Sequence, residues 1–402
     1  MAAKPFRTRI ERIIESIHEA GLRAPPTIVF GKGKLDELGE LAVPFARGQK
    51  ALVVLGGRSA VQSGLADRIQ TILSRCTIGF TAYPGIHREP TVALVDEAAA
   101  FARREAPKLV VSVGGGSVID CGKAVAALAV NEGSVEDYLE GVGRDLPLAH
   151  APLPHIAVPT VAGTGSEMTK NAVIGNLEKG YKKSMRFDAM IPQAAVVDPL
   201  LTLGVPLHVV ASGGMDTITQ LLEPCITIKR RPETTALALE GLRGVRQALS
   251  IAYEDPDHVA AREELSLASM LSGVCLANSG LAMAHGIAAA LGALFDVPHG
   301  LACGILLPHT LRYNRPACPR ELAQALAAFL GQPKPVPQTI EEGLEAIESL
   351  KRWLQVPPDL KYLGLKEPDL VRLAEASAGS SMSGNPIPMT PEKTLEFLST
   401  IA

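Results

Sequence analysis

The stretch KLVVSVGGGSVIDCGKAVAALAV, residues 108–130, decides the fold. Its first third is apolar without alternation, which predicts a strand buried on both faces, and residues 118–130 indicate a helix. The turn Gly114, Gly115, Gly116 and Ser117 joins the two. Glycines let a backbone approach a ligand closely, and the unpaired N–H groups at a helix start favour an anion. The turn is therefore a candidate pyrophosphate site, with a plain strand-to-helix turn as the alternative.

The alternation of apolar runs and helical patterns extends over residues 25–203. Further elements are predicted as strands at TIVFG (27–31), ALVVLGG (51–57), HIAVPT (155–160) and AAVVDP (194–199), and as a helix at 91–105. Apolar strands joined by helices are typical of a parallel sheet, so residues 25–203 are predicted to form an α/β domain. Residues 204–402 contain long helical patterns and predict an all-helical domain, and residues 1–24 predict an amphipathic N-terminal helical extension.

Composition excludes several classes of function. The 402 residues include 39 Lys and Arg against 42 Asp and Glu, and only 4% are aromatic. A net charge of −3 and few rings for base stacking disfavour a nucleic-acid partner. Six cysteines without a C-x-x-C pair, and no secretory signal, favour free thiols in a reducing compartment, so we expect a cytoplasmic location.

One uncharged stretch is long enough to cross a bilayer. No Lys, Arg, Asp or Glu lies between Glu264 and Asp296, and a membrane helix needs about 20 apolar residues. Serines, glycines and His285 inside the stretch, and the lack of flanking aromatic and basic clusters, argue against a membrane helix. We expect instead helices buried inside a soluble helical domain, with no membrane partner.

A second polar loop strengthens the case for a bound nucleotide. The segment VPTVAGTGSEMT (158–169) again follows a strand and offers Thr160 and Thr164. Ligands of open α/β sheets bind beyond the carboxyl ends of the strands, where both loops are predicted to lie. Two such loops favour a nucleotide site over two unrelated turns.

The exit of the predicted strand 51–57 bears on the choice of cofactor. NAD enzymes commonly place an acid there for the ribose hydroxyls, whereas this chain has Gly56, Gly57, Arg58 and Ser59. A guanidinium without a carboxylate suits a 2′-phosphate, which favours NADP, with NAD as the alternative. The ordinary interpretation of Arg58 is a solvated surface residue.

Candidate metal ligands are spread over the predicted helical domain. Asp216 and Gln220 lie four residues apart in GGMDTITQLLE and share one helix face, and His285 and His299 follow in HGIAAALGALFDVPHG. One carboxylate and two imidazoles can hold Fe(II) or Zn(II) and leave a position for a substrate oxygen. Each residue also has an ordinary alternative: a helix cap for Asp216, a core amide for Gln220, a carbonyl-bonded histidine for His285 and a surface turn for His299.

Taken together, these motifs resemble the iron-containing (group III) alcohol dehydrogenases from about Thr27 to the C-terminus. The markers, in order, are TIVFGKGKLDELGE, GGGSVIDCGKAVA, VPTVAGTGSEMT, AAVVDP, GGMDTITQLLE, GLAMAHGIAAALGALFDVPHGLA, ILLPH and NPIPMT. The resemblance implies a dinucleotide-binding α/β domain, an all-helical metal-binding domain and catalysis between them, commonly in a homodimer. Dehydroquinate synthase shares this architecture.

The resemblance also implies an activity and assigns residues to it. It implies reversible hydride transfer between NADP(H) or NAD(H) and a small primary alcohol or aldehyde, with Fe(II) or Zn(II) as Lewis acid. Asp216, His285 and His299 match catalytic metal ligands. The residues that match cofactor contacts are Gly56, Gly57, Ser59, Gly114, Gly115, Gly116, Ser117, Asp120, Lys123 and Thr160.

Two positions depart from the family pattern. Gln220 stands where the family has a ligand histidine, and Ala289 stands where a further histidine, a candidate proton relay, usually follows. Three rivals therefore stay open: a metal-independent reductase of the maleylacetate reductase type, a lyase of the dehydroquinate synthase type, and a catalytically decayed cofactor-binding subunit. Retention of Asp216, His285 and His299 favours the metal-dependent dehydrogenase.

Overall fold

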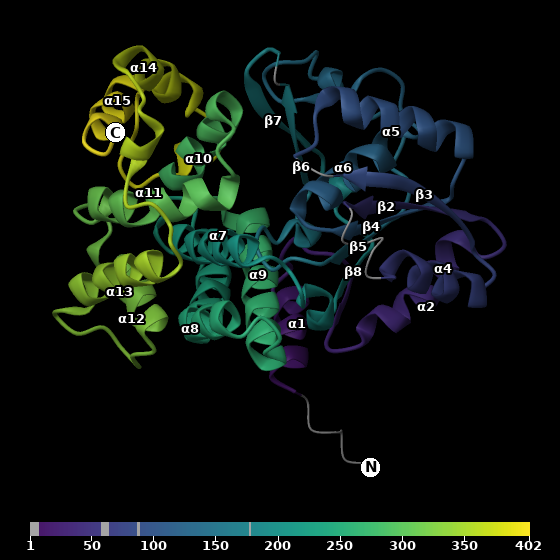
Figure 1. Ribbon diagram of the computed structural model, residues 1–402, viewed down its shortest axis with the longest axis horizontal. Helices are drawn as coiled ribbons and strands as arrows, with labels where there is room; N and C mark the ends of the chain where they lie inside the picture. The colour runs from purple at the N-terminus through teal and green to yellow at the C-terminus, as the bar shows by residue number, and fades with distance from the viewer. Residues whose placement is uncertain (1–7, 58–63, 87–88, 177) are drawn as a thin grey trace.

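A parallel sheet and a bundle of helices lie side by side in the computed structural model, which describes residues 8–57, 64–86, 89–176 and 178–402 (Figure 1). The sheet has the strand order β1-β8-β5-β4-β2-β3, with every neighbouring pair parallel. Its strands are β1 (Thr27–Phe30), β2 (Lys50–Gly56), β3 (Gly79–Ile86), β4 (Leu109–Gly114), β5 (His155–Pro159) and β8 (Ala194–Val197). This is the sheet that the continuous apolar runs predict.

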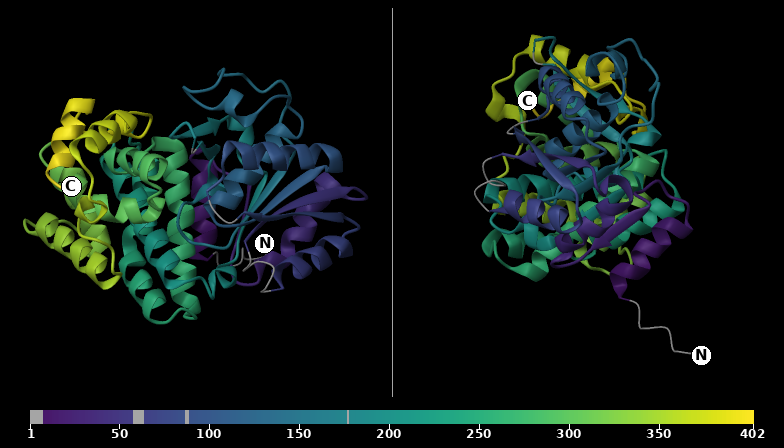
Figure 2. Two further views of the ribbon diagram at one scale, coloured as in Figure 1. Left: turned by 45° about the horizontal axis from the view of Figure 1, so that its top comes forward. Right: turned by 90° about the vertical axis from the view of Figure 1, so that its right-hand side faces the viewer.

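Helices cover both faces of the sheet (Figures 1 and 2). They are α2 (Leu38–Ala46) and α4 (Leu65–Arg75) on one face, and α5 (Val92–Glu105) and α6 (Gly116–Leu128) on the other. Val53 and Leu55 of β2 belong to the core under α2 and α4, whereas Leu52 and Val54 belong to the core under α5 and α6. Both sides of the strand are buried, which explains its unbroken apolar sequence.

Three strands have no clear signal in the sequence. The edge strand β3 contains Gly79, Pro84 and Gly85, and an edge position tolerates a proline because one side needs no ladder hydrogen bonds. The hairpin of β6 (Asn171–Asn176) and β7 (Tyr181–Arg186) is antiparallel and mostly half-buried, so its residues are largely polar.

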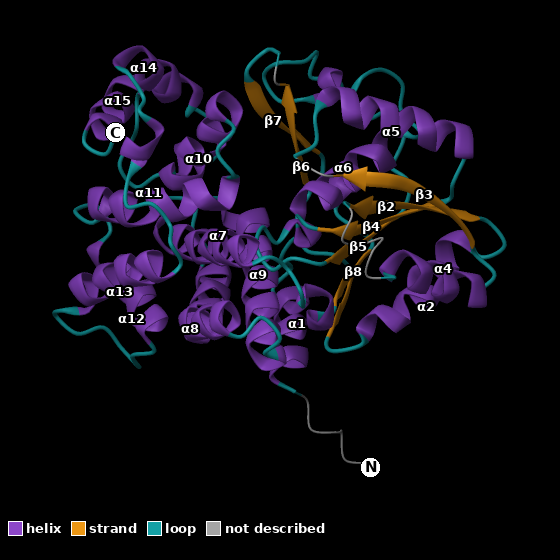
Figure 3. Ribbon diagram, in the orientation of Figure 1, coloured by secondary structure: helices purple, strands orange, loops and turns teal. Residues whose placement is uncertain are grey.

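The second half of the described chain is helical, as predicted, and Figure 3 shows helices alone there. Its helices are α7 (Leu207–Ile226), α8 (Pro232–Glu254), α9 (Val259–Ser279), α10 (Met283–Phe295), α11 (His299–Asn314), α12 (Pro319–Leu330), α13 (Thr339–Trp353), α14 (Glu367–Ala376) and α15 (Pro391–Ser399). The predicted N-terminal helix is α1 (Arg9–Glu19), with a capping box of Thr8 and Glu11. The side chain of Ile17 is buried in the core of the helical half. At the surface, Arg9 of α1 forms an ion pair with Glu240 of α8.

The uncharged stretch forms most of α9 and all of α10, and most of its residues are buried. Among the described residues, no single helix is both long and apolar enough to span a membrane. Helices α9 and α10 together would meet that length and hydropathy, but the chain bends by 101° between them. The prediction that this stretch forms buried helices is confirmed.

Candidate metal centre and cofactor loops

Three glycine-bearing loops follow three neighbouring strands of the sheet. β4 lies between β2 and β5, so Gly56 and Gly114 at two strand ends and Thr160 after the third are brought to the same edge. The Thr160 N–H donates to the Gly114 carbonyl across 3.0 Å, which holds two of the loops together. The Gly57 N–H donates to the carbonyl of Ile86. Arg58 and Ser59, predicted to meet the cofactor ribose, lie outside the described residues.

The first loop has no room for a side chain at Gly114 or at Gly116. A Cβ on Gly114 would lie 2.5 Å from Val118 Cγ2, and a Cβ on Gly116 would lie 2.5 Å from Thr164 Oγ1. Gly115 is the N-cap of α6, and no side chain caps this helix start. The turn therefore offers bare backbone and the positive end of a helix dipole, which fit the pyrophosphate of a dinucleotide.

Asp120 and Lys123 lie on α6 and bind the second loop. The Lys123 ammonium is fully buried and donates to Ser166 Oγ (2.8 Å), Thr169 Oγ1 (2.9 Å) and the Asn171 carbonyl (2.7 Å). Asp120 accepts a hydrogen bond from Ser166 and lies 3.3 Å from the ammonium. Burial lowers the pKa of Lys123. These contacts join the two loops, and the contact of either residue with a cofactor stays a prediction.

The second loop is also bound to the helical half. The Gly163 N–H donates to Ser269 Oγ on α9 (2.8 Å), and its carbonyl accepts from Thr217 Oγ1 on α7 (2.9 Å). Gln220 Nε2, one turn further along α7, donates to the Thr164 carbonyl (2.8 Å). The loop that follows β5 is thereby fixed beside the helix that carries Asp216 and Gln220.

Four side chains from three helices converge next to this loop. Asp216 comes from α7, His285 from the first turn of α10, and His299 and Cys303 from the first two turns of α11. One ligand atom of each lies within 4.8 Å of all the others. Asp216 Oδ1 is 3.3 Å from His285 Nε2 and 3.8 Å from His299 Nε2. Three of these far-separated residues are the ones that the sequence proposes as ligands.

Two of the four converging atoms lack a hydrogen-bonding partner among the described residues. Asp216 Oδ1 and His285 Nε2 are buried and form no aligned hydrogen bond with any described residue. Buried polar atoms without partners are costly, and a carboxylate facing two imidazoles is a donor set for a divalent cation. The residues present therefore fit a metal ion.

Glu223 supports the site from behind. One of its carboxylate oxygens lies 2.7 Å from His285 Nδ1, and its two oxygens accept the backbone N–H groups of Ala282 and Ala284. With a hydrogen on Nδ1 held by the Glu223 carboxylate, it is Nε2, beside Asp216, that would bind a cation once it has lost its proton. Glu223 is an outer partner of the kind that orients a metal-binding histidine.

Burial and charge set the protonation of the cluster. Burial lowers the pKa of His299 to about 4, although Asp216 opposes this. Burial also disfavours a charged His285, but Cys303, Glu223 and Asp216 raise its pKa well above the usual value. Burial would raise the pKa of Asp216, yet the two histidines bring it below the usual value. Burial raises the pKa of the Cys303 thiol to about 12. Without a cation, one proton on His285 balances Asp216, and a cation would displace it.

Two residues at the centre, Cys303 and Glu223, were missed in the sequence. Cys303 follows His299 by four residues, which puts both on one helix face, and Glu223 follows Asp216 by seven, or two turns. That spacing was the available signal. Gln220, predicted as a ligand, has its amide nitrogen bound to Thr164 and Ser272, and its role at a metal stays a prediction. Ala289 lies one turn beyond His285 and carries no proton acceptor.

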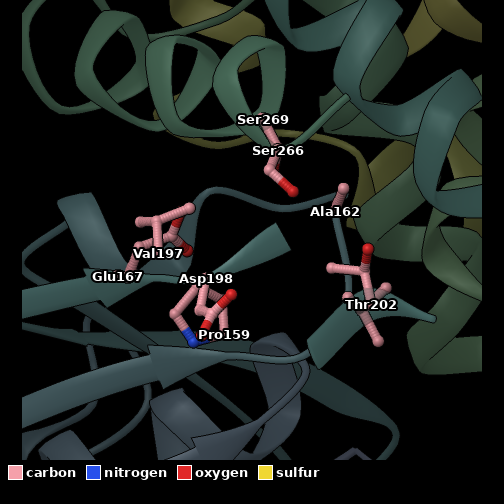
Figure 4. A pocket seen from close by; sticks show the side chains of 9 residues that line it. Pro159, Ala162, Glu167, Val197, Asp198, Thr202, Ser266 and Ser269 are labelled. Carbon is pink, nitrogen blue, oxygen red and sulfur yellow. The ribbon is translucent and has the colours of Figure 1, made fainter. Parts of the chain in front are cut away.

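Glu167 is a further buried acid that sequence analysis did not single out. It lines a small cavity between the ends of β5 and β8 and helix α9 (Figure 4). Burial raises its pKa to about 7. Ser266 and Ser269 face the same space from α9, and the buried Ser266 Oγ has no partner among the described residues.

Known proteins share both the sequence and the fold. The sequence pattern described as iron-containing alcohol dehydrogenase matches residues 25–199, and that of the C-terminal part of the Fe-containing alcohol dehydrogenase family matches residues 210–402. Alcohol dehydrogenase 4 of Saccharomyces cerevisiae is 33% identical over 382 residues, covering 94% of this chain and 97% of that protein. The 1,3-propanediol dehydrogenase of Citrobacter freundii is 34% identical over 357 residues, covering 87% and 90%.

A solved structure has the same architecture. The crystal structure of 1,3-propanediol oxidoreductase superposes with a TM-score of 0.86 at 30% identity, covering 94% of this chain and 98% of that one. The chain belongs to the iron-containing alcohol dehydrogenase family. It is an oxidoreductase acting on alcohols or aldehydes, and its family implies a metal ion and a nicotinamide cofactor.

Proposed function

We propose that the chain transfers hydride reversibly between NADP(H) and a small primary alcohol or aldehyde, at a divalent cation held by Asp216, His285 and His299. The observation that carries this proposal is the convergence of these side chains from α7, α10 and α11, in which the buried Asp216 Oδ1 and His285 Nε2 face each other without a hydrogen-bonding partner among the described residues. The hydrogen bond from Gln220 to Thr164 places this cluster beside a loop of the candidate cofactor site.

A bound cation and a nicotinamide would supply the reactive groups, and the residues of the chain hold and orient them. A cation in this site supplies Lewis-acid polarisation of a substrate oxygen, and a nicotinamide supplies or accepts hydride. Glu223 orients His285, and the bare backbone from Gly114 to Gly116 receives the pyrophosphate. Asp216 and His285 are 2% and 4% exposed, whereas the His299 side chain is 26% exposed. Substrate therefore approaches from the side of His299, and water is excluded from the opposite side.

Proton transfer needs no further histidine in this proposal. Ala289, one turn beyond His285, offers no side-chain acceptor. A proton released from an alcohol passes to solvent on the open side of the site.

The preference for NADP rests on the exit of β2. Gly56 and Gly57 bring no carboxylate to the end of this strand, and Arg58 supplies a guanidinium for a 2′-phosphate. The Arg58→Ala variant should raise the KM for NADPH by at least about tenfold, or about 1.4 kcal/mol, and leave the KM for NADH nearly unchanged. Equal effects on both cofactors would contradict the preference.

Substrate and metal dependence are tested together. The similarity to a 1,3-propanediol dehydrogenase supports a small substrate. Metal-stripped protein should bind NADPH but not oxidise it with short aliphatic aldehydes, and one equivalent of zinc or iron should restore turnover. Full activity in the presence of chelator would overturn the metal-dependent function in favour of a metal-independent reductase. NADPH binding without turnover under any condition would favour a decayed subunit.

A further inference from the structure

The metal cluster contains a cysteine whose role the proposed function leaves open. Cys303 Sγ is buried and lies 3.7 Å from His299 Nε2. Its distance to the ligand atoms of Asp216 and His285 is at most 4.8 Å. It is one of six free cysteines, and it is the one that belongs to this cluster.

The spacing of the four atoms suits a common centre. A four-coordinate ion with bonds of about 2.0 to 2.3 Å holds neighbouring ligand atoms roughly 3.4 to 3.6 Å apart. The observed separations between Asp216, His285, His299 and Cys303 include 3.3, 3.7 and 3.8 Å. The thiol sulfur therefore lies at ligand distance from His299 Nε2 and within 4.8 Å of the ligand atoms of Asp216 and His285.

Two glycines let helix α11 bring Cys303 to this position. A Cβ on Gly300 would lie 2.3 Å from the Ser212 carbonyl, and one on Gly304 would lie 3.0 Å from Met215 Cβ. Because these two residues have no side chains, α11 packs closely on α7. Because Cys303 follows His299 by one helical turn, this close packing presents both side chains to Asp216.

Gln220, by contrast, is used elsewhere. Its Nε2 donates to the Thr164 carbonyl and to Ser272 Oγ, each across 2.8 Å. Both hydrogens of the amide are engaged, so the side chain is fixed between the cofactor loop and α9. A turn of the amide group away from this position would cost these two buried hydrogen bonds.

We infer that Cys303 is the fourth protein ligand of the metal centre, in place of Gln220, and that it shifts the selectivity of the site toward zinc. The inference rests on the proposed metal site of Asp216, His285 and His299. On binding, the thiol releases its proton to solvent and the sulfur donates as a thiolate, which a divalent cation enforces even for a buried thiol. A thiolate is a soft ligand that suits zinc better than iron(II).

Cobalt(II) provides a readout that is independent of activity. Metal-stripped full-length protein is loaded with one equivalent of Co(II), and the near-ultraviolet thiolate-to-cobalt charge-transfer band is recorded. Wild type should show the band and Cys303→Ser should lose it. The matched control is Cys275→Ser, since Cys275 is also buried but donates to the Thr234 carbonyl in α8, a bond that serine can replace. This control should keep the band.

Selectivity is measured by competition. Most nitrogen and oxygen sites already prefer zinc to iron(II), so the quantity to compare is the ratio of the two affinities. Loss of an outer partner of a metal site costs about 10- to 100-fold in affinity, so loss of a direct ligand should cost at least about 100-fold for zinc. The ratio of zinc to iron affinity should fall at least about tenfold in Cys303→Ser. An unchanged ratio would overturn the selectivity.

The possible outcomes distinguish the role of Cys303 as a ligand from the existence of the proposed metal site. Stoichiometric cobalt without the band in wild type, with binding lost in His285→Ala, would overturn the role of Cys303 and leave the proposed site standing. No stoichiometric cobalt binding, or binding that survives His285→Ala, would overturn both. The wild-type spectrum decides the question even if Cys303→Ser fails to fold, and Cys303→Ala is the second variant.

Discussion

Glu223 and His285 form a buried pair in which a carboxylate oxygen lies 2.7 Å from Nδ1. The same carboxylate accepts hydrogen bonds from two backbone N–H groups at the start of α10. It therefore holds both the first turn of this helix and the imidazole in place. This pair lies behind the candidate metal ligands, and it fixes the direction in which His285 Nε2 points. Loss of the Glu223 carboxylate should therefore weaken metal binding more than the replacement of an exposed residue does.

Replacement of Glu223 by glutamine should weaken the metal site. The amide keeps one acceptor but turns a donor toward groups that themselves donate, so one buried N–H loses its partner. We expect zinc affinity to fall about 10- to 100-fold and the free energy of unfolding to fall by about 1 to 3 kcal/mol. Chelator competition and urea unfolding measure the two effects. Glu396→Gln, an exposed change in α15, is the control, and equal zinc affinity in both variants would contradict the role of Glu223.

A methyl group on Gly116 should disturb the cofactor loops. A Cβ there would lie 2.5 Å from Thr164 Oγ1, so the first two loops must separate. Overpacking of this kind costs about 1 to 3 kcal/mol, and Gly116→Ala should weaken NADPH binding by about tenfold or more. Fluorescence titration with NADPH measures the dissociation constant of the cofactor. Gly379→Ala is the matched control because a Cβ there meets nothing within 4 Å. Unchanged NADPH affinity in Gly116→Ala would place the cofactor elsewhere.

Two buried lysines allow the loop network to be tested separately from general stability. Lys123→Met leaves Asp120 without its ammonium and removes the two hydrogen bonds from Lys123 to Ser166 and Thr169 of the second loop. Lys351→Met removes hydrogen bonds to two carbonyls far along the helical half. Removing one member of a buried charged pair costs about 3 to 5 kcal/mol. We expect both variants to lose stability in urea, but only Lys123→Met to raise the KM for NADPH. Parallel effects of both on KM would refute a specific role for Lys123.

Glu167 should make stability depend on pH. Burial raises the pKa of Glu167 from 4.5 to about 7, so the folded protein binds this proton more tightly than the unfolded chain. The resulting stabilisation is fully present below pH 4.5 and is lost as the pH rises through about 7.

Compared with Glu167→Gln, wild type should lose up to about 3 kcal/mol of unfolding free energy across that window and nothing further above it. Urea unfolding at a series of pH values measures the difference. Parallel curves for the two proteins would show that Glu167 titrates normally. The exposed Glu396→Gln variant should follow wild type throughout.

Elements with strong local patterns could be predicted from the sequence. The strands at 51–57, 155–160 and 194–199 are continuous apolar runs because both of their faces are buried. The turn at 114–117 is visible because two of its positions, Gly114 and Gly116, leave no room for a side chain. The edge strand β3 and the hairpin of β6 and β7 lack this signal because half of their surface is exposed or unpaired. Their pairing depends on neighbours distant in the sequence.

Periodicity and chain order in the amino-acid sequence determined the class of fold and the glycine loops. Three of the converging side chains were proposed as ligands through the resemblance to the iron-containing alcohol dehydrogenases, because their spacing alone left an ordinary role open for each. Only the tertiary structure decided that Cys303 joins Asp216, His285 and His299, that Glu223 lies behind His285, and that the Gln220 amide nitrogen bonds to the cofactor loop. The physical reason is that these contacts join α7, α9, α10 and α11 across gaps set by side-chain packing. The close approach allowed by Gly300 and Gly304 has no local signature in the sequence.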